Sequence, residues 1–214
     1  AGGFGLIVTE ATAVSPEGRI SPQDAGIWDD AHVDAWRPTT AFVRSLGGAP
    51  VIQLAHAGNK AGSRRPWDGG GPADVEWPVV GPSDESWPRM HPVRRLDTAE
   101  VHRVQADFVA AAVRSIDAGF VGVELHAAHG YLLHSVYSPL SNRLDPPYGG
   151  DFEGRTRMLR ETTARVRDAI GPDAALLVRL SASDWTDGGW TIEDSVRLSR
   201  ELRELGTDLV DLSS

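Results

Sequence analysis

Five short apolar runs alternate with amphipathic segments along the 214-residue chain. The runs cover residues 6–8, 51–54, 120–125, 175–180 and 209–212. Between them, apolar residues recur at spacings of three and four, which predicts helices over about 33–46, 97–118, 152–170 and 191–205. Strands that alternate with helices predict a parallel sheet in a protein of the α/β class.

The starts of two predicted helices carry capping residues. Asp97 precedes Glu100 by three residues, and Thr191 precedes Asp194 by three, as in a capping box. We expect the last helix to bury its apolar stripe of Ile192, Val196, Leu202 and Leu205.

Residues 60–96 interrupt the alternation. Six of the 14 prolines fall here, together with three consecutive glycines and three tryptophans. So much Pro and Gly predicts neither helix nor strand. A long loop within a compact domain is usually functional or mobile, so we interpret this segment as a lid or a partner contact, with a disordered linker as the alternative.

Two architectures fit a parallel sheet of this kind, a doubly wound sheet and a (β/α)8 barrel. The glycines at 2, 3 and 5 precede the first run, so they do not form the glycine-rich turn that follows a dinucleotide-binding strand. In a barrel the site lies at the C-terminal ends of the strands. Polar residues gather at those positions here: Glu10, Thr12, Gln53, His56, His126, His129, Arg179, Ser181 and Ser213. The pattern therefore favours a (β/α)8 TIM barrel.

Composition narrows the classes of function. The 21 basic and 30 acidic residues give a net charge of −9, which disfavours nucleic acid as a partner because phosphate binding needs a surplus of cations. No apolar run approaches the ~18 residues of a membrane span. The chain has no cysteine, which excludes disulfides and cysteine-ligated metals from these residues and fits a cytoplasmic protein.

The segment His126-Ala127-Ala128-His129-Gly130-Tyr131 follows the third apolar run and holds the main candidates for chemistry. Two neutral histidines can donate two N–H bonds to one oxygen and so polarise a carbonyl group. A tyrosine with its usual pKa of ~10 is a weak acid that can protonate a carbanion-like centre. The alternatives are a metal site, which would need a third ligand, and two histidines with only a structural role.

Arg179, Gln53 and Lys60 are further candidates. Arg179 on a buried strand should meet an anion or an electron-rich ligand, or form an ion pair with Glu124 or Asp211. Gln53 offers a donor and an acceptor on one amide, as the pyrimidine edge of a flavin needs, or it is a hydrogen-bonded core amide. Lys60 is the only lysine. A lysine in a barrel could form a Schiff base with a substrate, but the position of Lys60 at the start of the long loop disfavours this role.

Seven segments run in a recognisable order over nearly the whole chain: EATAV at 10–14, GIW at 26–28, QLAHAG at 53–58, HAAHGY at 126–131, SPLSN at 138–142, YGG at 148–150 and VRLSASD at 178–184. Each is weak alone, but the ordered set resembles the Old Yellow Enzyme family of FMN-dependent ene-reductases. The resemblance is greatest to its thermophilic-like bacterial branch.

The resemblance implies a barrel that binds FMN and uses NAD(P)H to reduce the activated C=C bond of an α,β-unsaturated carbonyl or nitro compound. By matching motif, the flavin contacts fall on Ala11, Gln53 and Arg179. A small-molecule alkene is then the partner, no metal is implied, and a homo-oligomer is compatible with the family.

The substrate contacts implied by the same resemblance fall on the double-histidine segment. His126 and His129 would bind the carbonyl or nitro oxygen, and Tyr131 would be the proton donor. The alternatives are a dienoyl-CoA-reductase-like flavoenzyme, which the double histidine and tyrosine disfavour, and a non-catalytic truncated barrel that acts as a binding module.

The five runs correspond to strands two to six of the family's eight. We therefore expect residues 1–214 to form one domain that is an incomplete barrel, and the chain to be part of a longer enzyme. The family's first strand and its FMN phosphate site have no counterpart in these residues. On its own, the chain is expected not to bind FMN tightly.

Overall fold

The computed structural model describes residues 2–213, and its centre is a five-stranded parallel sheet in the order β1-β2-β5-β6-β7. The strands are β1 (Leu6–Ala13), β2 (Ala49–Ala55), β5 (Gly122–Ala127), β6 (Ala175–Ser181) and β7 (Leu209–Ser213). Each strand pairs with the next one of this sheet in chain order, as in a barrel and without the reversal of a doubly wound sheet. The predicted α/β class and incomplete barrel are confirmed. Among the described residues, β1 and β7 are each paired on one side only.

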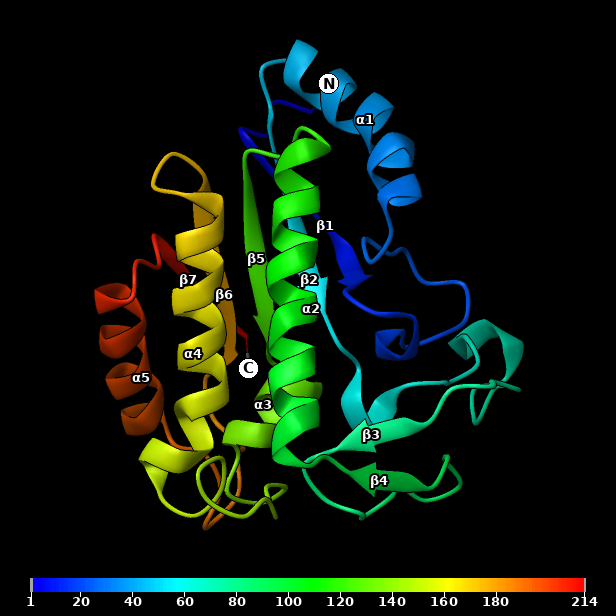
Figure 1. Cartoon of the computed structure of the whole chain (residues 1–214), viewed down its shortest axis with the longest axis vertical. Coiled ribbons are helices and arrows are strands. Elements are labelled where there is room, and N and C mark those ends of the chain that lie inside the picture. The colour runs from blue at the N-terminus through cyan, green and yellow to red at the C-terminus, as the bar shows by residue number, and fades with distance from the viewer. Residues whose placement is uncertain (1, 214) are drawn as a thin grey trace.

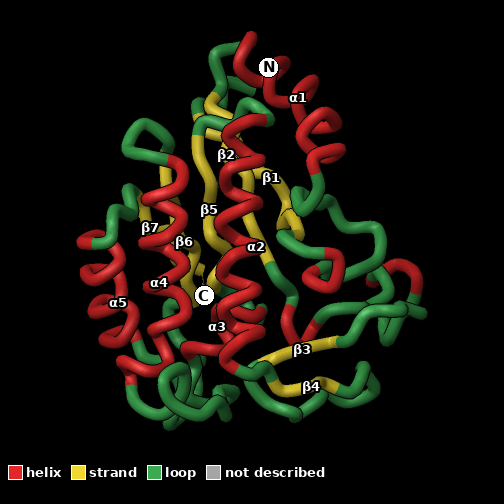
Figure 2. Tube along the Cα trace, viewed as in Figure 1, coloured by secondary structure: helices red, strands yellow, loops and turns green. Residues whose placement is uncertain are grey.

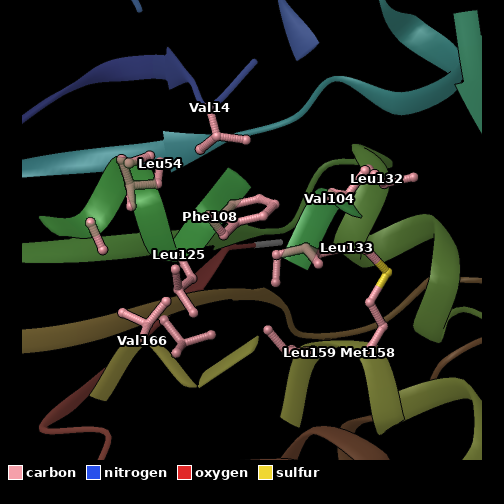
Figure 3. Packing of buried hydrophobic residues seen from close by; sticks show 14 of the residues in the cluster. Val14, Leu54, Val104, Phe108, Leu125, Leu132, Leu133, Met158, Leu159 and Val166 are labelled. Carbon is pink, nitrogen blue, oxygen red and sulfur yellow. The ribbon is translucent and has the colours of Figure 1, made fainter. Parts of the chain in front are cut away.

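Helices connect the strands and cover one face of the sheet (Figure 1). They are α1 (Asp30–Ser45), α2 (Thr98–Asp117), the short α3 (Leu132–Tyr137), α4 (Phe152–Ile170) and α5 (Ile192–Glu204). Phe108 of α2 is fully buried near Leu125 of β5, and Met158 of α4 belongs to the same cluster of buried hydrophobic side chains (Figure 3). The helix-facing side of the sheet is therefore the hydrophobic core.

The capping residues predicted from the sequence are confirmed. In α2, Asp97 accepts the Glu100 N–H at 2.8 Å, and the Glu100 carboxylate accepts the Asp97 N–H at 3.1 Å. Thr191 and Asp194 form the same reciprocal pair at the start of α5.

The prediction that α5 buries Ile192 and Val196 is wrong, because these side chains are 56% and 46% exposed. Leu202 of the predicted stripe is fully buried, and Leu198, which was not predicted, is buried beside it. The two exposed residues line a surface groove with Leu212 of β7. Among the described residues β7 is an edge strand, so no further strand or helix of this range packs beyond it.

Residues 60–96 contain regular structure, although the sequence predicted neither helix nor strand there. The 3-10 turn η2 (Gly58–Lys60) ends where they begin. They hold one further 3-10 turn, η3 (Pro66–Asp68), and two short parallel strands, β3 (Val79–Gly81) and β4 (Val93–Arg95). Val79 and Val93 pack with Ala57, Ala61 and Tyr131 in a second, smaller cluster. This burial overrides the local effect of Pro and Gly. The segment lies at the end of the molecule where the strands of the large sheet terminate, as the long loops in Figure 2 show.

β1 extends to Ala13, beyond the predicted run of 6–8, with a register shift between Val8 and Ala11. No helix within residues 2–213 is both long and apolar enough to cross a membrane.

Candidate active site

Four of the predicted site residues lie on one face of the sheet, toward the C-terminal ends of the strands: Ala11, Gln53, His126 and Arg179. His129 and Tyr131 lie in the turn that follows β5. Ala11 of β1 pairs with Gln53 of β2, and His126 of β5 pairs with Arg179 of β6, which pairs with Asp211 of β7. Residues directly paired across parallel strands point to the same side of a sheet. The register therefore brings the residues predicted for flavin contact and His126 to a common, polar face, opposite the hydrophobic core.

His126 and His129 are adjacent but differ in environment. Their ring centroids are 5.1 Å apart with the rings nearly perpendicular. His126 is 3% exposed, and its Nδ1 has no hydrogen-bond partner among the described residues. His129 is exposed, and its Nε2 lies 2.7 Å from the Ser213 hydroxyl. The pair thus presents ring nitrogens at the open end of the sheet.

Both histidines are neutral at pH 7. Burial lowers the pKa of His126 to about 3, and the nearby His129 and Arg179 act in the same direction. The pKa of His129 is also lowered, first by burial and then by Arg179. A neutral imidazole carries one N–H donor and keeps its charge at zero, so the pair is suited to hold an oxygen that becomes negative.

Tyr131 lies against this pair, with its ring centroid 5.0 Å from that of His126. Burial, followed by the charge of Asp24, raises the pKa of Tyr131 above its usual value. The phenol is therefore protonated at neutral pH and available as a proton donor.

Lys60 also reaches the site. Its ammonium donates to the carbonyl of His129 at 2.7 Å and lies 5.1 Å from the ring centre of Trp87. The structure thus ties the start of the long loop to the double-histidine turn. From the sequence, we considered only a Schiff-base role for Lys60. This contact could not be predicted, because its partner is a backbone carbonyl 69 residues away.

The structural alternatives considered for Gln53 and Arg179 are both realised. Gln53 Nε2 donates to Glu124 Oε1 at 2.9 Å in a buried contact, and burial raises the pKa of Glu124. Arg179 Nε lies 3.2 Å from Asp211 Oδ2, yet this buried nitrogen has no partner with hydrogen-bond geometry. These contacts leave room for a ligand role, since each group has more donors than its one contact uses.

The metal alternative for the two histidines lacks a third ligand. Within residues 2–213, no group of three or more His, Cys, Asp or Glu side chains is arranged to hold a metal ion.

The family model described as "NADH:flavin oxidoreductase / NADH oxidase family" matches residues 1–214. The chain belongs to this family. An NADPH dehydrogenase of Bacillus velezensis is 43% identical over 214 residues, which cover all of this chain and 59% of that protein. An NADH:flavin oxidoreductase of Gibberella zeae is 40% identical, with 99% and 56% covered. The chain thus spans less than two thirds of the length of these relatives.

Solved structures agree with this assignment. An Old Yellow Enzyme homologue from Zymomonas mobilis superposes with a TM-score of 0.80 at 31% identity, over 97% of this chain and 59% of that one. Morphinone reductase in complex with tetrahydroNAD gives a TM-score of 0.82 at 26% identity, over 97% and 60%. The resemblance inferred from the ordered motifs is confirmed at the level of family and fold.

Proposed function

We propose that this flavin oxidoreductase binds FMN and uses NAD(P)H to reduce the activated C=C bond of an α,β-unsaturated carbonyl or nitro compound. The observation that carries the proposal is the pair of neutral histidines with a protonated tyrosine beside them, at the end of a polar sheet face. Family membership supports it.

The polar face fits a flavin ring. Arg179 Nε is buried and makes no hydrogen bond, although the Asp211 carboxylate lies 3.2 Å from it. Gln53 lies across β5 from Arg179, with a donor and an acceptor on one amide. Together with the small side chain of Ala11, these residues would hold the ring. When bound, FMN would supply the hydride that it receives from NAD(P)H. The positive charge of Arg179 would favour negative charge on the ring.

The histidines and the tyrosine would act on the substrate. His126 and His129 would each donate one N–H to the substrate oxygen and stabilise the charge that develops there, and removing one such donor costs about 10²–10³ in rate in other enzymes. Tyr131 would then give its proton to the substrate carbon.

The Tyr131→Phe variant tests this assignment. We expect it to slow reduction of an alkene such as 2-cyclohexenone by roughly 10²-fold, while NADPH still reduces the flavin at an unchanged rate. Stopped-flow absorbance of the flavin, on the product of the complete gene, separates the two half-reactions. Equal loss in both would remove Tyr131 as the proton donor, and a colourless protein would favour the non-catalytic binding module.

A further inference from the structure

A buried pair outside the predicted contacts lies next to the double-histidine turn. It consists of His134 of α3 and Asp184 of the loop after β6. His134 Nε2 is 3.0 Å from Asp184 Oδ1, and the two side chains are 10% and 9% exposed. A sequence signal exists, because both residues lie within or beside the recognised motifs, but 50 residues separate them.

The hydrogen bonds of His134 select one tautomer. The Gly130 N–H donates to His134 Nδ1 at 2.7 Å. A ring nitrogen that accepts a hydrogen bond carries no proton, so the proton of the neutral ring is on Nε2 and is donated to Asp184.

Asp184 is itself held in place by donors. Its Oδ2 accepts the Trp190 N–H at 2.8 Å and the Ser138 hydroxyl at 2.6 Å. Burial acts in the opposite direction, but the hydrogen bonds from His134 and Ser138 keep the pKa of Asp184 below its usual value. The group is therefore a carboxylate whose two oxygens face fixed donors.

The turn that this pair contacts has an uncommon backbone conformation. His129 and Gly130 have φ values of 61° and 72°, and left-handed backbone is rare for a residue other than glycine. Two side chains accept hydrogen bonds from the backbone amides of this turn. The His129 N–H donates to Ser181 Oγ at 3.0 Å, and the Gly130 N–H donates to His134.

We propose that His134 and Asp184 are positioning residues for the substrate site. The pair fixes the left-handed turn at 129–130 and thereby sets the direction of His129 and Tyr131, which flank Gly130. Neither residue touches the substrate. The role toward substrate rests on the proposed function, whereas the tautomer and the fixed turn are properties of this chain alone.

The Asp184→Asn variant inverts this arrangement. The Trp190 N–H requires an acceptor, so the amide oxygen of the new side chain faces Trp190 and its NH2 group faces His134. His134 must then accept at Nε2 and carry its proton on Nδ1, where it opposes the Gly130 N–H. A nearly isosteric change thus imposes the wrong tautomer, as it does for the histidine of a catalytic triad.

The test uses the FMN-loaded product of the complete gene, with ¹⁵N-labelled histidine. NMR is expected to show the His134 proton on Nε2 in the unaltered protein and on Nδ1 in Asp184→Asn. Amide exchange at Gly130 should become at least about tenfold faster, and the dissociation constant for 4-nitrophenol should rise by about tenfold or more. The FMN dissociation constant should stay unchanged, because the pair does not contact Ala11, Gln53 or Arg179.

Three further variants complete the test. Asp187→Asn changes an exposed carboxylate nearby and should behave as the unaltered protein. His134→Gln keeps an acceptor and a donor and should retain 4-nitrophenol affinity, whereas His134→Leu should lose it. If Asp184→Asn does not fold, the comparison of His134→Gln with His134→Leu decides. An equal loss of 4-nitrophenol affinity in these two variants overturns the proposal.

Other outcomes are equally decisive. A proton on Nδ1 of His134 in the unaltered protein, or unchanged Gly130 exchange in Asp184→Asn, overturns the inference. If the unaltered protein binds FMN but no 4-nitrophenol, the substrate assignment of the proposed function fails. The NMR and exchange measurements still decide whether the pair fixes the turn.

Discussion

His56, at the end of β2, is 1% exposed, and its Nδ1 accepts the Gly58 N–H at 3.1 Å. Burial lowers the pKa of His56 to about 4, Glu17 opposes the shift, and Arg103 adds to it. Its unfolded pKa is near 6.5, so between about pH 6.5 and pH 4 the unfolded chain binds more protons than the folded one. The free energy of unfolding therefore falls as the pH falls through this window.

We expect His56→Gln to remove most of this pH dependence. From the two pKa values, the contribution of His56 between pH 7 and pH 5 is roughly 2 kcal/mol. Urea unfolding at both pH values measures it, with His91→Gln, at a half-buried histidine, as the control. Burial raises the pKa of Asp107 to about 6, which favours folding at low pH, so only the difference between variants is informative. If the free energy of unfolding changed between the two pH values by the same amount in His56→Gln and His91→Gln, His56 would not be the source of the pH dependence.

At the scale of elements, the pairing of β5 with β6 depends on a glycine. A Cβ placed on Gly122 would lie 2.4 Å from the backbone oxygen and 2.6 Å from the Cβ of Ala175, its partner in β6. Neither atom can move without displacing a strand. We expect Gly122→Ala to destabilise the fold by about 2–4 kcal/mol.

Gly5→Ala is the matched control for this change, because nothing lies within 4 Å of a Cβ at Gly5 and its backbone has no positive φ. Thermal unfolding of both variants gives the comparison. Equal melting temperatures would show that the two strands can separate at this point at little cost.

The elements themselves were largely readable from the sequence. Apolar spacing located the long helices, and Asp97 with Glu100 marked the start of α2. The strands β3 and β4 were not readable, because Val79 and Val93 are ordered by contacts with Ala57 and Ala61, far from them in the chain. Local propensity in a Pro- and Gly-rich segment says nothing of such contacts.

At the scale of the whole molecule, the described fold exposes apolar surface beside both free strands. Phe4, Phe42 and Leu46 near β1 are 77%, 64% and 56% exposed. Ile192 and Leu212 near β7 are 56% and 57% exposed. In a closed barrel, a strand or helix covers such positions, whereas within residues 2–213 the strands β1 and β7 are each paired on one side only.

We therefore expect the 214-residue chain, expressed alone, to bind FMN weakly. Ala11, Gln53 and Arg179 would contact one side of the flavin ring at most, because the five strands of residues 2–213 would not enclose it. Titration of FMN followed by its fluorescence measures the affinity, with the product of the complete gene as the reference. Sub-micromolar binding, with bleaching of the flavin on addition of NADPH, would contradict this expectation.

The candidate site was predicted in part. The sequence placed Gln53, His126 and Arg179 at strand ends, and the register confirms that they share one face. It did not reveal His134, Asp184 or the contact of Lys60 with the His129 carbonyl. The first group follows from the alternation of side chains along a strand. The second depends on loop and backbone conformation, which has no period.

The amino-acid sequence by itself determined the α/β class, the number of strands in the sheet and the family, because apolar periodicity and ordered motifs are local properties of the chain. The tertiary structure decided which polar groups meet. It exposed Ile192 and Val196, ordered β3 and β4, and paired His134 with Asp184. These outcomes depend on burial and on contacts between distant segments, which only the folded chain brings together.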